Sequence, residues 1–151
     1  MKELYEQKGY PKDWIEKRIR GIAIRQELTD EWKERGVTED INFAILTNEI
    51  TKATFGMGVQ EYKKFKGLQN QNLRDHMGDW ELIFTMVGEK ATTDIAKARD
   101  AQGFEENKSA ANRGGQIANN ARNELEKETG KPIVSKENFL GLAEKKKKKL
   151  N

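Results

Sequence analysis

The chain has 151 residues, of which 35% are hydrophobic and 35% are charged, and its formal net charge is +3. The absence of cysteine excludes disulfides, a thiol nucleophile and a cysteine-ligated metal, and the single histidine excludes a multi-histidine metal site. No apolar run approaches the ~20 residues that a membrane-spanning helix needs, so we expect a cytoplasmic protein with no membrane partner.

Two prolines and the lack of strand-like alternation predict an all-α fold of five to six helices, arranged as a compact helical bundle. Residues 1–10 are interpreted as an N-terminal extension and residues 11–143 as a single helical domain. A long N-terminal helix is expected to begin at Pro11 and to stop at Gly36, because proline suits a first turn and glycine a helix end. Gly21 inside this helix indicates a close helix contact or a bend.

The next segments show further helix signals. Thr38 is the predicted N-cap of a second helix that ends at Gly56, and a short helix follows over residues 59–66. The polar stretch 68–77 is expected to be a loop with a short helical turn. Asp79 is the predicted N-cap of a long third helix, and Gly103 would end this helix or lie just beyond it. Its apolar face would contain Trp80, Ile83, Phe84, Val87, Ala91, Ile95 and Ala98.

A fourth helix is predicted from Phe104 onward, with an apolar face made mostly of small residues, and it would end at Gly130. A face of small residues allows close backbone approach but buries little area. A last helix capped by Ser135 would carry Phe139, Leu140 and Leu142. The chain would finish with a lysine-rich tail over residues 144–151.

Two lysine clusters indicate nucleic-acid binding as an alternative function. Tyr62 and Phe65 alternate with the lysines of the short helix, and such aromatics can stack on unpaired bases or point into the core. The five lysines of the tail can bind phosphates or remain a solvated end. The candidate nucleic-acid contacts are Lys63, Lys64, Lys66, Lys145, Lys146 and Lys147.

Catalysis is the weakest functional hypothesis. His76 beside Asp75 could act as a general base, but neither a nucleophile nor a second histidine stands at a catalytic spacing. A metal-dependent nuclease, the remaining enzymatic alternative, would need a carboxylate cluster. We therefore expect a non-enzyme with no catalytic residue, metal or cofactor. His76 more simply caps the following helix, or bonds to Asp75 or to a backbone group.

An ordered series of short motifs resembles a known family. The series comprises Phe43-Ala44-Ile45 with Asn48, Phe55-Gly56, Lys66-Gly67-Leu68, and Leu73-x-Asp75-His76-Met77-x-x-x-Glu81-Leu82. It resembles the C-terminal half of the DNA-damage-inducible protein D family, which also occurs in phage antirepressor-like proteins with a BRO-type N-terminal domain. The similarity covers roughly residues 38–140, and its most specific elements are Lys66, Gly67, Leu68, Asp75, His76 and Met77.

The resemblance implies a role in the DNA-damage response or in phage and mobile-element regulation. Residues 14–36 look like the helix that follows the BRO domain, and the BRO domain itself is expected to be absent. Proteins of this family are linked to the control of recombinase filaments on single-stranded DNA. We therefore expect an interaction module that binds a protein of DNA metabolism, such as a recombinase or a repressor. The low aliphatic content also leaves a homodimer open.

The predicted partner-binding surface combines basic residues with the amide-rich face of the fourth helix. Asparagine is a poor helix former, so its abundance there indicates a surface that hydrogen-bonds a partner, or a tolerated polar face. The predicted contacts are Arg18, Arg25, Asn112, Arg113, Asn119 and Arg122.

Overall fold

The computed structural model describes residues 1–141 of the chain, and these contain six α-helices and one 3₁₀ turn. The all-α prediction of five to six helices is therefore confirmed. In chain order the elements are α1 (Lys2–Gln7), α2 (Lys12–Glu34), α3 (Asp40–Phe55), α4 (Val59–Phe65), η1 (Leu73–His76), α5 (Asp79–Arg99) and α6 (Gly103–Thr129).

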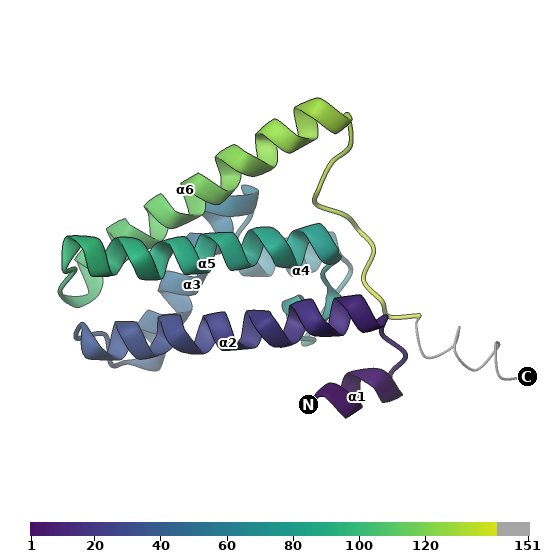
Figure 1. Cartoon of the computed structure of the whole chain (residues 1–151), viewed down its shortest axis with the longest axis horizontal. Helices are drawn as coiled ribbons and strands as arrows, with labels where there is room; N and C mark the ends of the chain where they lie inside the picture. Colours follow the sequence, from purple (N-terminus) through teal and green to yellow (C-terminus); the bar gives the residue numbers. More distant parts are fainter. Residues whose placement is uncertain (142–151) are drawn as a thin grey trace, which may run out of the picture.

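Helix α5 occupies the middle of the bundle. It packs against α2 on one side and against α6 on another, while α3 lies behind and packs against both α5 and α6 (Figure 1). Helices α2 and α6 are thus separated by α5. None of the helices described in residues 1–141 is long and apolar enough to cross a membrane.

Helix α2 follows its sequence signals closely. It starts after Pro11 and ends two residues before Gly36, whose φ of 88° lies in the left-handed region that glycine adopts easily. Gly21 is buried against α5, and a Cβ added there would meet the side chain of Met86 at 3.8 Å. Gly21 therefore lies in a helix contact, but the contact is an ordinary one with room for a Cβ and not the close approach expected.

Two helix N-caps differ from the predictions. The N-cap of α3 is Glu39 rather than Thr38, and the N-cap of α5 is Gly78 rather than Asp79. Helix α5 ends at Arg99, because Asp100 adopts the left-handed conformation with φ of 51°. Gly103 therefore lies just beyond α5, which is one of the two positions expected for it, and begins α6.

The small-residue face of α6 lies against α3 and α5, so the close backbone approach that such a face allows is made within this chain. Gly114 faces α5, where an added Cβ would lie 2.8 Å from the backbone nitrogen of Thr92. Gly115 faces α3, where an added Cβ would lie 2.8 Å from the carbonyl oxygen of Ile50. Both distances are too short for a side chain, so glycine is what permits these helices to approach.

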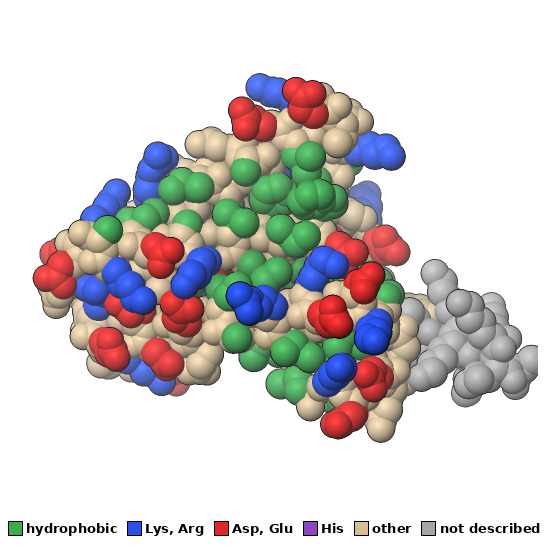
Figure 2. All heavy atoms as spheres, in the orientation of Figure 1, with side chains coloured by type: hydrophobic (Ala, Val, Ile, Leu, Met, Phe, Trp, Pro, Cys, Tyr) green, Lys and Arg blue, Asp and Glu red, His purple; other side chains and the backbone are tan. Residues whose placement is uncertain are grey.

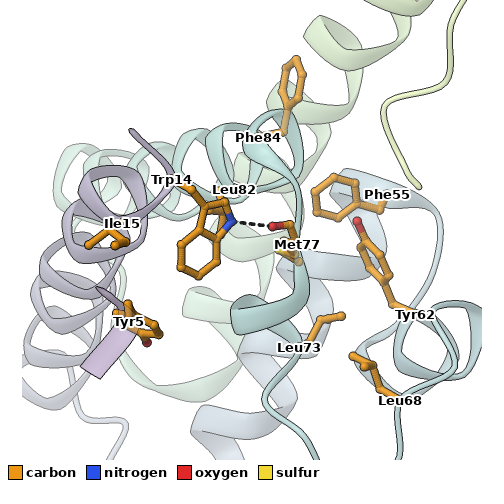
Figure 3. Packing of buried hydrophobic residues seen from close by; sticks show 10 residues of the cluster. All are labelled: Tyr5, Trp14, Ile15, Phe55, Tyr62, Leu68, Leu73, Met77, Leu82 and Phe84. Atoms are coloured by element: carbon orange, nitrogen blue, oxygen red, sulfur yellow. Dashed lines mark hydrogen bonds between the residues drawn. The ribbon is translucent and has the colours of Figure 1, made fainter. Parts of the chain in front are cut away.

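The hydrophobic core has two main parts. One lies at the end of the bundle where α1, α2, α4 and the start of α5 meet, and it contains Tyr5, Trp14, Ile15, Phe55, Tyr62, Leu68, Leu73, Met77, Leu82 and Phe84 (Figure 3). The other part lies towards the C-terminal half of α2 and contains Leu28, Trp32, Val37, Leu46, Ile50 and Ala111. Tyr5 ties α1 to this core, although no helix was predicted in the first ten residues.

The buried face of α5 is more polar than predicted. Its buried residues include Glu81, Glu89 and the threonines at 85, 92 and 93, whereas Trp80 is 49% exposed and Val87 is 37% exposed. Each of the three threonine hydroxyls donates to the carbonyl four residues earlier, which satisfies it inside the helix. Part of the apolar stripe expected in the core therefore faces outward.

The predicted last helix is absent from the described residues after α6. Residues 131–141 contain only bends and a turn, and Phe139 has a φ of 60°. The carbonyl oxygens of Ser135 and Glu137 accept hydrogen bonds from Lys66, which removes the acceptors that a helix starting at Ser135 would use. Leu142 and the lysine-rich tail over residues 144–151 lie outside the described residues.

Candidate functional site

The chain between α4 and α5 contains the most specific motif residues, and we call residues 66–78 the junction loop. Gly67 has a φ of 75°, which lets the chain turn away from α4 immediately after Lys66. Leu68 and Met77 are buried in the larger core cluster. These motif residues therefore hold the loop in place, and its remaining polar groups contact both the N-terminal and the C-terminal segments of the described chain.

Asp75 connects the junction loop to the N-terminal segments. Its Oδ1 accepts a hydrogen bond from the Tyr5 hydroxyl at 2.8 Å. The same oxygen forms an ion pair with Arg18, whose Nε lies 3.0 Å away. Its carbonyl oxygen accepts a hydrogen bond from the Tyr10 hydroxyl at 2.6 Å. Burial, followed by the charge of Asp75, raises the pKa of Tyr10 to about 12, so that hydroxyl remains a donor at neutral pH.

His76 and Met77 extend these connections. The backbone carbonyl of Met77 accepts a hydrogen bond from Nε1 of Trp14 at 2.7 Å (Figure 3). Nδ1 of His76 donates to the carbonyl of Asn138 in the C-terminal segment. His76 thus bonds to a backbone group, one of the structural roles expected from the sequence.

Lys66 and Glu81 form a fully buried ion pair. Nζ of Lys66 lies 2.9 Å from Oε1 of Glu81 and donates to the carbonyls of Ser135 and Glu137, both at 2.7 Å. All three protons of the ammonium group therefore have acceptors. Glu81 also accepts hydrogen bonds from the Tyr62 hydroxyl and from the backbone nitrogen of Gly78.

The burial of Lys66 corrects one prediction. Lys66 is only 2% exposed, so its assignment to a surface track of phosphate contacts is wrong. The sequence placed it beside Lys63 and Lys64, but it is the last residue before the turn at Gly67 and it points inward. A lysine can be buried in this way when a carboxylate and carbonyls neutralise and solvate it.

Residues 133–139, which we call the C-terminal strap, are held by these same groups. Nδ2 of Asn138 donates a hydrogen bond to the carbonyl of Lys66 at 2.7 Å. The ring centroid of Phe139 lies 5.4 Å from that of Tyr10 and 5.8 Å from that of Trp14. The strap therefore packs both on the junction loop and on the aromatic cluster that Tyr5 of α1 joins.

The change Asn138→Ala should loosen the strap without melting the helices. It removes the hydrogen bond to Lys66, worth about 1 kcal/mol, and should speed proteolytic cleavage within residues 131–141. Limited proteolysis with mass spectrometry measures this. Glu137→Ala is the matched control, since its exposed side chain is removed while the carbonyl that binds Lys66 remains. Equal cleavage rates in both variants would contradict the role of Asn138.

A second buried ionic cluster joins α2, η1 and α5. Glu89 has a side chain that is 1% exposed; it accepts two hydrogen bonds from Arg74, at 2.6 and 2.8 Å, and one from Arg25 at 3.0 Å. Burial alone would raise the pKa of Glu89, but the two guanidinium groups outweigh it and hold that pKa below its usual value. The three groups therefore carry one surplus positive charge.

The predicted partner contacts on α2 face inward. Arg18 and Arg25 do share a helix face, but it is the face that contacts η1 and α5. The side chain of Arg18 is 8% exposed and that of Arg25 is 27% exposed, with its guanidinium also 5.2 Å above the ring of Trp32. Arg18 is therefore a structural residue, and the prediction that it forms part of an exposed partner-binding surface is wrong.

The predicted contacts on α6 do not form one surface. Arg113 and Arg122 are nine residues apart, which turns them by about 180° around the helix axis. Arg122 faces α3 and donates to the carbonyl of Thr54 at 2.9 Å, while it also contacts Asn119 and Glu126. Asn112 bonds to Glu49 of α3 at 2.8 Å. Only Arg113 of this set is exposed without a long-range partner in the described residues, so its contact role stays a prediction.

Of the predicted nucleic-acid contacts, Lys63 and Lys64 are on the surface of α4. Lys64 is exposed and Lys63 is partly buried. Tyr62 points into the core and Phe65 is 38% exposed, with Lys136 placed 5.6 Å above its ring. Lys145, Lys146 and Lys147 lie outside the described residues.

An apolar surface is open on α5 and α6. Figure 2 shows hydrophobic side chains gathered in a band over these two helices. Trp80 and Val87 are one heptad apart on the same side of α5, and Ile117 of α6 is 38% exposed. Arg113 stands one turn before Ile117. We call Trp80, Val87 and Ile117 the α5–α6 apolar face.

Sequence reasoning did not find Arg74, Glu89 or Asn138, and it named Glu81 only as a member of the motif series, without a role. With 28 basic and 25 acidic residues in the chain, a particular ion pair cannot be chosen from composition. One usable signal was present: Glu81, Thr85 and Glu89 recur every four residues and so mark one helical face. Among the described residues, no group of three or more histidines and carboxylates could hold a metal ion.

This geometry defines the protein as an all-helical domain. The domain is organised around the junction loop and two buried ionic clusters. The sequence matches the family model of the DinD C-terminal domain over residues 16–138, and the chain belongs to that family. The resemblance found in the motifs is thereby confirmed, and it places the chain among DNA-damage-inducible proteins. No curated protein and no solved structure gives a significant match.

The family match begins earlier than the similarity expected from the motifs. It includes most of α2, which was interpreted as a linking helix that precedes the family module. The structure gives the reason: Arg18 and Arg25 of α2 bind Asp75 and Glu89, so the motif region depends on this helix for its ion pairs.

Proposed function

We propose that this chain is a non-enzymatic interaction module that binds a protein of DNA metabolism, such as a recombinase filament or a repressor. The observation that carries the proposal is the α5–α6 apolar face. Trp80, Val87 and Ile117 are each more than a third exposed, and Trp80 is the kind of residue that dominates binding energy at interfaces. Arg113 would add a polar contact at the rim.

The junction loop supports the non-enzymatic part of the proposal. Asp75 and His76, the residues of the catalytic alternative, are bonded to Arg18, Tyr5 and the carbonyl of Asn138. These contacts give both side chains a structural purpose. The DNA-metabolism part of the proposal rests on membership of the DinD C-terminal domain family.

The double variant Val87→Glu with Ile117→Glu should weaken partner binding about 100-fold, because two charges would be buried in an apolar contact. Both side chains are partly exposed, so the fold should persist, as circular dichroism can verify. The measurement is co-sedimentation with a purified recombinase filament on single-stranded DNA, and in parallel a pull-down with a purified repressor.

Ile41→Glu is the control for this test. Ile41 is 65% exposed on α3, away from the α5–α6 apolar face, and its change should leave binding intact. A wild-type chain that binds naked single-stranded DNA as well as the filament would instead favour the nucleic-acid alternative. Equal losses in the control and the double variant would contradict the assigned face.

A further inference from the structure

A polar cavity of about 290 Å³ opens between α3, α4 and the loop that carries η1. None of the described residues that line this cavity is acidic, and two of them, Lys63 and Arg74, are cationic. Threonine hydroxyls and the amides of Asn70 and Asn72 supply further polar groups. The lining therefore offers hydrogen-bond donors and positive charge to whatever enters.

Thr51 is the most informative residue of the lining. It is 8% exposed, and its hydroxyl has no hydrogen-bond partner among the described residues. The other buried threonines, at positions 54, 85, 92 and 93, each donate to the carbonyl four residues earlier. The Thr51 oxygen is not sealed from solvent, in contrast to Nε1 of Trp32 and Oδ1 of Asn107, so this hydroxyl is free to donate to a group that enters the cavity.

The charges beside Thr51 define the acceptor as an anion. Glu89 accepts hydrogen bonds from two of the five N–H groups of Arg74 and from one N–H group of Arg25. Its single negative charge neutralises one of the two guanidinium charges, so the cluster of three residues keeps one positive charge. Lys63 is partly buried and forms no ion pair with a described carboxylate. Lys63 therefore places one uncompensated positive charge at this cavity, and the surplus charge of the ionic cluster is shared between Arg74 at the cavity and Arg25 at the larger recess beside it, which favours an anion such as a phosphate monoester.

A second, larger recess adjoins the polar cavity. It measures about 730 Å³, shares Thr47 and Val59 with the polar cavity, and is lined by Ile41, Ala44 and Ile45 on the outer face of α3. Ligand sites combine an apolar recess with a few polar groups that fix orientation. The two cavities together would accept an anionic group attached to a ring or another apolar body.

We propose that this cavity binds a phosphate monoester, with the Thr51 hydroxyl, the Lys63 ammonium group and the Arg74 guanidinium group as its donors. The organic part of the ligand occupies the recess over Ile41 and Ile45. This site is separate from the α5–α6 apolar face and does not depend on it. The phosphate group belongs either to a free nucleotide or to the end of a nucleic-acid strand.

The test is a titration with thymidine 5′-monophosphate, followed by calorimetry and by NMR shifts of the residues around α3 and α4. The wild-type protein should bind it saturably at millimolar or lower concentration, and thymidine without phosphate should bind at least about 10-fold more weakly. Lys63→Gln should weaken binding about 10-fold, because one charge-assisted contact is lost. No saturable binding at millimolar concentration would overturn the proposal.

Two further variants distinguish binding at this specific site from non-specific electrostatic attraction of the phosphate to the protein surface. Thr51→Val preserves the side-chain shape and removes a hydroxyl that has no partner, so binding should fall about 5-fold while the melting temperature stays the same or rises. Lys64→Gln removes an exposed neighbouring charge that does not line the cavity, and it should leave binding within about 2-fold. A loss in Lys64→Gln equal to that in Lys63→Gln would overturn the proposal.

The source of the phosphate is distinguished with single-stranded oligonucleotides of one sequence, with and without a 5′-phosphate. If the phosphorylated strand binds at least about 10-fold more tightly than the nucleotide, the site is assigned to strand ends. If the phosphorylated strand binds more weakly than the nucleotide, the site is assigned to a free nucleotide. Equal binding of both strands without competition by the nucleotide would overturn the site. The variant Val87→Glu with Ile117→Glu should bind the nucleotide normally, which keeps this proposal distinct from the proposed protein interface.

Discussion

Replacing Glu89 by glutamine is expected to lower the free energy of unfolding by about 3–5 kcal/mol and the melting temperature by about 6–20 °C. The change removes the only negative charge between Arg25 and Arg74 and leaves two buried or half-buried guanidinium groups facing each other. Thermal and urea denaturation measure the effect. Glu27→Gln is the control, because Glu27 makes exposed ion pairs with Lys90 and Lys97, and its loss should cost less than about 1 kcal/mol.

We also expect the stability difference between the wild-type protein and Glu89→Gln to depend on pH. The folded pKa of Glu89 lies below its usual value, so its contribution to stability is complete above the unfolded carboxyl pKa of about 4.3 and is lost as the pH falls below it. The stability difference between wild type and Glu89→Gln should therefore narrow on acidification below about pH 4. A difference that stays constant down to low pH would show that the charge of Glu89 is not the source of the effect.

Gly115→Ala is expected to destabilise the protein by about 3 kcal/mol or more, although alanine is the better helix former. The added methyl group would collide with the Ile50 carbonyl and the side chain of Ala53. Backbone and Cβ atoms cannot rotate away, so α3 and α6 would have to separate. Chemical denaturation gives the change in stability, and hydrogen exchange should show faster opening of α6 and α3.

The control is Gly21→Ala, the same substitution within a helix where space exists. An added Cβ there meets only the Met86 side chain, at 3.8 and 3.9 Å, which is ordinary contact. This variant should gain about 0.5–1 kcal/mol from the helix preference of alanine. Stabilisation by both substitutions would contradict the close approach of α6 to α3.

Much of the fold follows from local signals. Glycines after α2, α3 and α6 end these helices in the left-handed conformation, and Pro11 precedes α2, so the positions of the long helices could be predicted to within a few residues. The glycine and alanine face of α6 correctly indicated close packing. The motif series also identified the family, because residue types at fixed spacings are present in the sequence itself.

Side-chain direction could not be predicted in the same way. Lys66 follows two surface lysines, yet the turn at Gly67 and the acceptors at Glu81, Ser135 and Glu137 draw it into the interior. The stripe that begins at Trp80 is as apolar as a core face, yet α6 and α3 pack on the neighbouring face of α5 that carries Gly88 and Thr92. In both cases the outcome depends on residues distant in the sequence.

The sequence alone determined the helical class, most helix boundaries, the absence of thiol chemistry and membership of the DinD C-terminal domain family. These depend on composition, on local conformational preference and on fixed motif spacings. Only the tertiary structure decided which charges are buried, which apolar face stays open and which hydroxyl lacks a partner. Those properties arise when α2, the junction loop, α5 and the C-terminal strap meet, because burial and pairing belong to contacts between segments.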